Sequence, residues 1–247
     1  MRTAIHTPVR AILFDFDDTL FDHALTSRRA LARLRSQGTM FRGVPLSNLW
    51  CRYLELLERS HVDVVSGKIS VDDARTERFR SLAALSGRDL TREAATELAL
   101  TYRGFYHDLR RAVPWALPLL RHLRPRYRIA IVSNNRVAEQ EEKLRFLGAS
   151  ALVDALVVSE GVGFAKPDPR IFRVALDRLA VSAEGSVMIG DSWTSDVEGA
   201  CSAGVRPIWF NRFHRPHPDD SARPPVAEVD SFRSPLAVER AVTSGES

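Results

Sequence analysis

Cysteine is scarce in this sequence, which contains only Cys51 and Cys201. The two residues form no Cys-x-x-Cys pair and no disulfide framework, which argues against a disulfide-stabilised secreted domain. No apolar run approaches the length of a membrane span, and residues 1–10 lack the apolar centre of a secretion signal. We therefore expect a cytoplasmic protein with no membrane partner.

Lysine is also rare. Only Lys68, Lys143 and Lys166 occur, so arginine carries almost all of the positive charge behind the net charge of +4. The arginines are scattered among acidic residues instead of forming basic runs, which favours a solvated surface over a nucleic-acid partner. A weaker interpretation is that the basic field attracts anionic substrates.

The length and the order of the expected elements indicate two domains. At 247 residues the chain is long enough for a core domain with an insert. Residues 22–111 have helical periodicity and no convincing strand, whereas strands and helices alternate in the rest of the chain. This alternation predicts an α/β fold with a doubly wound, parallel, Rossmann-like sheet. We expect residues 1–21 and 112–247 to form that core domain, and residues 22–111 to form an all-helical domain.

The expected helices of the helical domain cover Ala24–Gln37, Leu46–Arg59 and Ala74–Leu85, with one or two more between Leu90 and Arg111. Strands of the core domain are expected at Ala11–Phe14, Arg128–Ser133, Ala155–Val158, Ser186–Ile189, Arg206–Phe210 and Val226–Val229. Its helices are expected at Ala116–Leu123, Ala138–Leu147, Pro169–Leu179, Asp196–Ala203 and Pro235–Val242. Residues 1–8 and 212–225 are expected to be irregular.

Three carboxylates crowd the end of the first expected strand. Asp15, Asp17 and Asp18 follow the apolar run Ala11–Phe14, and like charges this close disfavour joint ionisation unless a cation neutralises them. Hard carboxylate oxygens suit Mg²⁺ best. Because residues i and i+2 of an extended chain point the same way, Asp15 and Asp17 can face one substrate. A solvated turn that holds three acidic residues is the alternative.

Three further polar motifs follow expected strands, at the edge where open parallel sheets bind ligands. They are Ser133-Asn134-Asn135, the loop Gly163–Pro169 with Lys166, and Gly190–Asp196 with Asp191. Each has an ordinary structural alternative, because Ser, Asn and Asp are common helix caps and Lys166 could lie on the surface. In a chain that otherwise uses arginine, a lysine before Pro-Asp-Pro favours a functional role.

Together, these motifs and the segment Asp15–Leu20 resemble the four motifs of the haloacid dehalogenase superfamily, in family order and from about Val9 to Asn211. The resemblance implies that Asp15 is a nucleophile that attacks phosphorus. It also implies that Asp17 is the general acid/base.

The same resemblance implies how phosphate would be bound. The hydroxyl of Ser133 and the backbone N–H groups of Phe16 and Asn134 would hold its oxygens. Lys166 would place a positive charge against the phosphate and against Asp15. Asn135 departs from the family pattern, which often has Gly or Thr there, as does Trp193 in place of Leu; neither residue belongs to the implied chemistry.

The implied cofactor is Mg²⁺. Its ligands would be the carboxylates of Asp15 and Asp191 and the backbone carbonyl of Asp17. Asp196 would lie behind them and orient Lys166 or a water on the metal.

Asp17 also separates the reactions of the superfamily. Its dehalogenases lack an acid at this position because a halide leaves without a proton, whereas an alkoxide does not. The resemblance therefore implies a phosphatase, or less favourably a phosphomutase. Gly190–Asp196 with Gly204 and Trp209–Asn211 resembles the pyrimidine 5′-nucleotidase branch, so a nucleoside 5′-monophosphate is the first substrate expected. Sugar phosphates and phosphoglycolate are the nearest alternatives.

Residues 22–111 stand where the family places a small helical cap that closes over the site and sets substrate choice. Asp22 and His23 begin this segment and are candidates to face the substrate. Trp50, Tyr53 and Trp115 could stack on a base, but aromatic residues at helical spacing more often belong to a core, and we favour that interpretation.

Two other classes of function remain. One is a catalytically silent protein on the same fold that binds a phosphorylated ligand or regulates, and the other is a basic nucleic-acid binder. The intact set of motif residues favours an enzyme acting on a small phosphorylated substrate. We expect a monomer or a homodimer.

Overall fold

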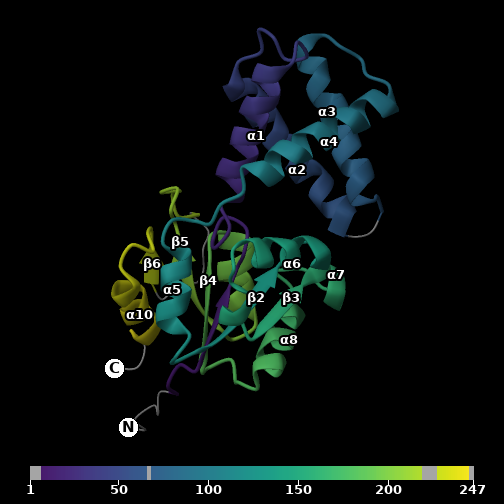
Figure 1. The fold of residues 1–247 in the computed structure, drawn as a ribbon. Coiled ribbons are helices and arrows are strands. Elements are labelled where there is room, and N and C mark those ends of the chain that lie inside the picture. The colour runs from purple at the N-terminus through teal and green to yellow at the C-terminus, as the bar shows by residue number, and fades with distance from the viewer. Residues whose placement is uncertain (1–6, 66–67, 219–226, 245–247) are drawn as a thin grey trace. The chain divides into compact units, whose positions relative to one another are not determined.

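The computed structural model describes residues 7–65, 68–218 and 227–244. The described chain divides into two compact units. The first is formed by the segments that end at Asp22 and begin at Ala112, and the second is His23–Arg111. Strands belong to the first unit, whereas the described part of the second unit consists of helices and their connections (Figure 1).

A six-stranded parallel sheet forms the centre of the first unit, in the order β3-β2-β1-β4-β5-β6. The strands are β1 (Ala11–Phe14), β2 (Arg128–Ser133), β3 (Ala155–Val158), β4 (Ser186–Gly190), β5 (Arg206–Phe210) and β6 (Ala227–Val229). The chain runs outward from β1 through β2 and β3, and then returns to β4 on the other side of β1. Sheets with such a reversal bind ligands beyond the carboxyl ends of the strands that flank it. The predicted doubly wound parallel sheet is confirmed.

The central strand β1 is buried on both faces, which explains its unbroken apolar sequence. Leu13 packs in a cluster with Val132 of β2 and Phe172 of α8 (Pro169–Leu179). Phe14 points to the opposite face and is equally inaccessible to solvent. The carboxylates that follow β1 are therefore fixed to a rigid part of the molecule.

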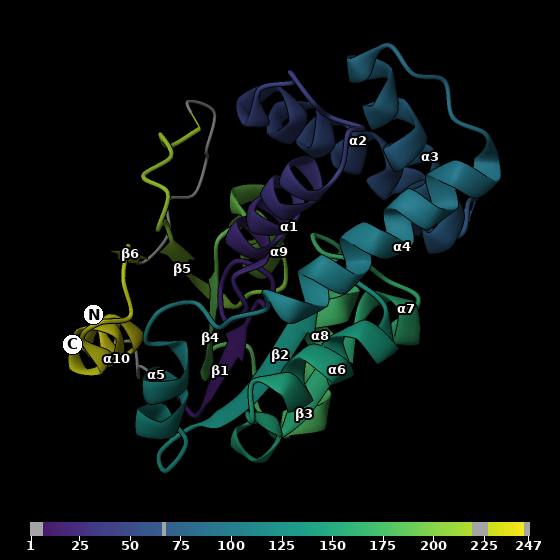
Figure 2. The same cartoon turned by 45° about the horizontal axis from the view of Figure 1, so that its top comes forward.

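Helices lie on both sides of this sheet (Figure 1, Figure 2). In both views α5 and α10 lie together near β6, and α6, α7 and α8 lie toward β2 and β3. Helix α8 packs on the face of the sheet that carries Leu13. Besides α8, these helices are α5 (Ala116–Leu123), α6 (Val137–Phe146), α7 (Ser159–Val162), α9 (Gly199–Ser202) and α10 (Pro235–Thr243). The unit also contains the 3₁₀ turn η2 (Ser150–Leu152), which is wound more tightly than an α-helix, and the π-helical segment η3 (Trp193–Glu198), which is wound more loosely.

The described residues of the second unit form four α-helices that pack around an aromatic core. They are α1 (His23–Gln37), α2 (Leu46–Val65), α3 (Val71–Ala83), which continues into the 3₁₀ turn η1 (Ala84–Ser86), and α4 (Arg92–Asp108). Tyr53, Phe79 and Tyr102 meet in this core, and the Tyr102 hydroxyl donates to that of Tyr53 at 3.1 Å. Ser70 and Thr91 cap α3 and α4 by accepting hydrogen bonds from backbone N–H groups of the first turn.

Most expected elements occur within a few residues of their predicted bounds, and three differ in kind or extent. Helix α2 extends to Val65, beyond the predicted end at Arg59. The helix predicted from Asp196 begins three residues earlier, as the π-helical segment η3. The short helix α7 was not predicted, because four residues carry no periodic signal.

The prediction that Trp115 belongs to a core is wrong, whereas it holds for Tyr53. Trp115 is 52% exposed, because it precedes α5 with a φ of +68° and its side chain is not on the buried face of that helix. Trp50 is half-buried against the core of the helical unit. No helix in the described ranges is long and apolar enough to cross a membrane.

Parts of three predictions lie outside the described residues. These parts are residues 1–6 of the predicted N-terminal lead-in, residues 219–225 of the predicted irregular segment, and Val226 at the start of the predicted edge strand. The described remainder of that strand, β6, pairs in parallel with β5 at the sheet edge.

Candidate active site

Three carboxylates converge at the carboxyl ends of the two strands that flank the reversal. Asp15 follows β1, Asp191 follows β4, and Asp196 lies in η3. Oxygen atoms of all three lie within 4.8 Å of one another, so the group could hold a metal ion. Carboxylate oxygens are ligands that Mg²⁺ prefers, and the donor set of this cluster therefore fits that cation.

Lys166 is a positive charge inside this cluster. Its buried ammonium donates to Asp15 Oδ1 at 2.5 Å and to Asp196 Oδ1 at 2.6 Å. Thr19 Oγ1 donates to the other oxygen of Asp15 at 3.3 Å. One lysine and three carboxylates leave the cluster with surplus negative charge when all are ionised.

Burial and this surplus charge shift the protonation of the cluster. Burial, opposed by Lys166 and assisted by the charge of Asp196, raises the pKa of Asp15 to about 7. Burial and the neighbouring carboxylates also raise the pKa of Asp191 well above its ordinary value. Burial alone would lower the pKa of Lys166, but its two carboxylate partners raise it instead. A cation that bound here would relieve the repulsion.

The loop that carries Lys166 is fixed by an asparagine side chain. Asn134 donates its Nδ2 to the Lys166 carbonyl at 2.8 Å and accepts the Lys166 N–H on Oδ1 at 2.7 Å. The amide of Asn134 is thereby engaged with the backbone of that loop, so a phosphate contact from this residue falls to its backbone N–H. The Lys166–Pro167 peptide bond is cis.

Asp196 is held from two directions besides Lys166. Its Oδ2 accepts the Ser192 N–H at 3.0 Å, and its carboxylate packs directly over Gly190, where any Cβ would overlap it. The glycine at the end of β4 is therefore required by a close approach.

Asp17 faces a different set of partners from Asp15. Its Oδ2 accepts from Asn135 Nδ2 at 3.1 Å and from Gln140 Nε2 at 2.9 Å, and its Oδ1 accepts from Lys143 Nζ at 2.6 Å. The same Gln140 amide donates to Ser133 Oγ at 2.6 Å. Sequence reasoning missed both Gln140 and Lys143, although the rarity of lysine was an available signal, and it wrongly placed Asn135 outside the site.

Phe16 and Ser133 lie where the motifs predict them. Phe16 is buried, and its carbonyl accepts the N–H groups of Leu20 and Phe21, which closes the loop after β1. Ser133 ends β2. The structure thus brings the predicted residues of the first unit together at one edge of the sheet.

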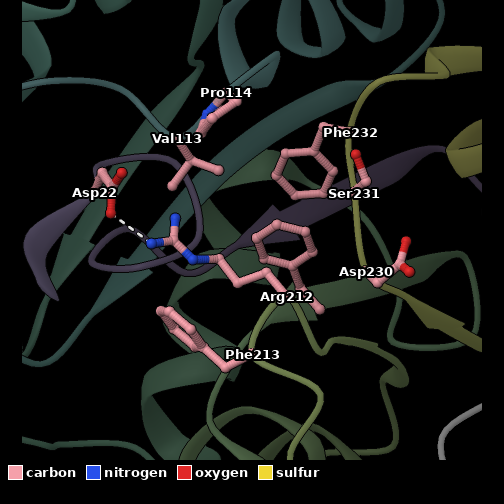
Figure 3. A pocket seen from close by; sticks show the side chains of 9 residues that line it. Asp22, Val113, Pro114, Arg212, Phe213, Asp230, Ser231 and Phe232 are labelled. Carbon is pink, nitrogen blue, oxygen red and sulfur yellow. Dashed lines mark hydrogen bonds and ion pairs between the residues drawn. The ribbon is translucent and has the colours of Figure 1, made fainter. Parts of the chain in front are cut away.

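Two arginines after β5 also contact the acidic loops. Arg212 donates to Asp22 at 2.5 Å and lies 3.8 Å from Asp18. Arg215 lies 3.7 Å from Asp191 Oδ2. Figure 3 shows Arg212 reaching Asp22 beside the ring of Phe213, in a cavity of about 310 Å³ that belongs wholly to the first unit.

The two candidates for substrate contact from the start of the helical segment fall in different units. Asp22 belongs to the first unit, where it is buried against Arg212. His23 begins α1 of the second unit, and its Nδ1 lies 2.8 Å from the Tyr106 hydroxyl. Both side chains therefore have protein partners within their own units.

Comparison with known proteins identifies similar chains. A family model described as haloacid dehalogenase-like hydrolase matches residues 9–204. The glyceraldehyde 3-phosphate phosphatase of Methanothermobacter thermautotrophicus is 33% identical over 208 residues, which cover 82% of this chain and 86% of that protein. The pyrimidine 5′-nucleotidase YjjG of Escherichia coli is 37% identical over 111 residues, which cover 44% of this chain and 49% of that protein.

A solved structure is similar over almost the whole chain. It is the putative haloacid dehalogenase-type hydrolase YfnB of Bacillus subtilis, bound to magnesium, with a TM-score of 0.75 and 26% sequence identity. The match covers 94% of this chain and 99% of that one.

Proposed function

We propose that this chain, a phosphatase that belongs to the haloacid dehalogenase-like hydrolase family, hydrolyses small phosphomonoesters. The proposed reaction passes through a phosphorylated aspartate at position 15 and uses Mg²⁺ as cofactor. The observation that carries this proposal is the contact of the buried Asp15 with Lys166, beside Asp191 and at the carboxyl end of the central strand.

In the first step an oxygen of Asp15 attacks phosphorus. The bond from phosphorus to the ester oxygen breaks as the bond to Asp15 forms. Lys166 lies against both Asp15 and Asp196, so its charge offsets the repulsion between the nucleophile and an anionic phosphate. Ser133 and the backbone N–H groups of Phe16 and Asn134 are proposed to bind the other phosphate oxygens.

Asp17 is proposed to handle protons in both steps. It gives a proton to the ester oxygen that leaves, and it then takes one from the water that attacks the phosphorylated Asp15. That second attack breaks the bond between Asp15 and phosphorus, so the enzyme is regenerated and inorganic phosphate is released. An acid at this position suits an alkoxide leaving group, which needs a proton, better than a halide.

Mg²⁺ is proposed to be held by Asp15, Asp191 and the backbone carbonyl of Asp17, where it would neutralise charge on the phosphate and the carboxylates. The raised pKa values of Asp15 and Asp191 are consistent with this, because burial and, after it, the neighbouring carboxylates disfavour their charged forms, and a divalent cation would stabilise those forms. The magnesium in the similar YfnB structure is consistent with the same cofactor.

We propose that the helical unit, with the predicted bounds 22–111, serves as the cap domain that selects the substrate. A nucleoside 5′-monophosphate remains the first substrate to test, on the resemblance of the motif that contains Asp191. Glyceraldehyde 3-phosphate is the second, because a relative that is 33% identical over 82% of this chain is named for that reaction. The protein is proposed to be a cytoplasmic monomer or homodimer without a membrane partner, and the scattered arginines favour the absence of a nucleic-acid partner.

The test is release of inorganic phosphate from p-nitrophenyl phosphate, with MgCl₂ and with EDTA. Turnover that requires Mg²⁺ is expected. A panel of nucleoside monophosphates, glyceraldehyde 3-phosphate, sugar phosphates and phosphoglycolate then ranks substrates by kcat/KM. No turnover of any ester in the presence of Mg²⁺ would favour a silent phosphate-binding protein instead.

A further inference from the structure

Three side chains that follow β2 in the sequence donate hydrogen bonds to the carboxylate of Asp17. Lys143 Nζ lies 2.6 Å from Oδ1, and Gln140 Nε2 lies 2.9 Å from Oδ2. Asn135 supplies a further donor to Oδ2 at 3.1 Å. A lysine ammonium has three donors and no acceptor, so Asp17 Oδ1 accepts the hydrogen bond from Lys143.

Gln140 and Lys143 act from the same face of α6. They are three residues apart, and helical residues at this spacing lie side by side. Helix α6 begins four residues after Ser133, the last residue of β2. Its first turns therefore lie over the edge of the sheet that carries the candidate site.

Stability alone does not explain these two residues. Gln140 is fully buried, and its Oε1 has no hydrogen-bond partner among the described residues. Burial of an unpaired polar atom costs about 1–3 kcal/mol, so an apolar side chain would serve packing better. Lys143 is also buried, where a lysine is unusual, and its ammonium lies 5.0 Å from the centre of the Phe21 ring.

We propose that Lys143 and Gln140 are positioning residues for phosphoryl transfer, which hold the carboxylate of Asp17 in the orientation from which it exchanges protons with the leaving oxygen and with water. Gln140 joins this orientation to the phosphate-binding motif, because the same amide donates to Ser133. The inference rests on the proposed function, since it concerns the same site and the same two steps.

Two kinds of ester separate a positioning role from a structural one. The p-nitrophenolate ion leaves readily without a proton, whereas the alkoxide of an alkyl phosphate needs one. Because kcat/KM reports events up to the first release of the leaving group, displacement of Asp17 lowers kcat/KM for the alkyl ester and spares it for the aryl ester. A general loss of structure lowers both values equally.

The variant is Lys143→Met, measured with p-nitrophenyl phosphate and with the alkyl phosphate that the enzyme hydrolyses best. We expect kcat/KM to fall roughly 10- to 100-fold for the alkyl ester, a part of the full effect of an acid–base group, and to change less than about threefold for the aryl ester. Lys143→Arg keeps a charged donor and should recover part of the alkyl-ester rate. Arg145→Met is the matched control, because it also removes a positive charge from α6. Among the ion pairs described, the Arg145 side chain pairs only with Glu141, at 3.7 Å.

Equal losses on the two esters, or no loss on either, would overturn the proposal. A second measurement does not depend on turnover: crystal structures of the wild type and of Lys143→Met should show Asp17 bound to Lys143 in the first and turned away from that place in the second. An unmoved Asp17 would also overturn the proposal. The proposed function itself fails separately, if wild-type enzyme releases no phosphate from any ester.

Discussion

Asp15 and Lys166 are 151 positions apart in the sequence, and their side chains meet at 2.5 Å in a buried ion pair. The lysine is shared with Asp196, so a single cation serves two carboxylates while a third, Asp191, lies within 4.8 Å of both. This incomplete neutralisation is the physical basis of the proposed magnesium site and of the predictions that follow.

Replacement of Asp17 by asparagine tests the proposed acid–base role. Asp17→Asn keeps an oxygen acceptor for Lys143 but cannot carry the transferred proton. We expect kcat/KM for the best alkyl phosphate to fall roughly 10²- to 10⁴-fold, the usual range for loss of an acid–base group. Steady-state kinetics on purified variant and wild type give the ratio, and an unchanged rate would show that the leaving oxygen needs no proton from this residue.

Gly190→Ala tests the close approach of Asp196. A Cβ at this position would overlap the Asp196 carboxylate, so that carboxylate must move and Lys166 loses a partner. We expect kcat to fall at least tenfold, on the scale of a lost charge-assisted hydrogen bond of roughly 1.5–3 kcal/mol. The matched control is Gly104→Ala in α4, where a Cβ meets nothing within 4 Å. That change should leave kcat unaltered, and equal kcat values for both variants would contradict the role given to Gly190.

The raised pKa of Asp15 predicts that metal binding depends on pH. The pKa of this buried carboxyl is about 7 in the folded protein against an ordinary value of 3.8, and a metal binds the ionised form. Because Asp191, the second proposed ligand, also has a raised pKa, affinity for Mg²⁺ should fall by at least about tenfold per pH unit below pH 7. Titration calorimetry with MgCl₂ from pH 5.5 to 8.5 measures this, and affinity that does not vary across the range would contradict it.

The same shift has a consequence for metal-free stability. The folded state holds the proton of Asp15 up to about pH 7, whereas the unfolded chain releases it near its ordinary pKa of 3.8. The contribution of Asp15 to the free energy of unfolding therefore falls as pH rises from about 4 to 7. Added Mg²⁺ should raise the Tm more at pH 8 than at pH 5.5.

Removal of the Arg215 side chain should increase the affinity for Mg²⁺. Its guanidinium lies 3.7 Å from Asp191 Oδ2, and the Asn211 side chain holds its backbone N–H and carbonyl at 2.8 and 2.9 Å. A cation at Asp191 must compete with this charge. Because the arginine is half exposed, the pair contributes at most about 1 kcal/mol, so Arg215→Ala should bind Mg²⁺ up to about fivefold more tightly. Arg215→Lys retains the charge and is the control; weaker binding by the alanine variant would contradict the prediction.

The sheet and its polar edge could be predicted from the sequence because each signal is local. A short apolar run that leads into a polar residue, such as Asp15 after β1 or Ser133 at the end of β2, marks both a buried strand and its end. Parallel pairing then brings these ends to one edge without further information. Ser70 and Thr91, which cap α3 and α4, are residue types that favour a helix start by a local interaction of the same kind.

The contacts that Gln140 and Lys143 make with Asp17, and that Arg215 makes with Asp191, could not be predicted, because they depend on how distant segments pack. In the sequence, Gln140 and Lys143 resemble ordinary polar residues of a helix. Only the packing of α6 shows that both side chains contact Asp17, which follows β1. Arg215 lies in a segment whose composition suggested only irregular structure. The exposure of Trp115 was missed for a similar reason, since the φ of +68° at that residue leaves no mark in the hydrophobic pattern.

The most direct test of the account is a crystal structure of the enzyme with MgCl₂ and beryllium fluoride, which mimics a phosphoryl group on a carboxylate. We predict beryllium bonded to a carboxylate oxygen of Asp15, magnesium contacting both Asp15 and Asp191, and no adduct in Asp15→Asn, which should also lack turnover. An adduct on any other atom, or a magnesium ion that contacts neither Asp15 nor Asp191, would contradict the account.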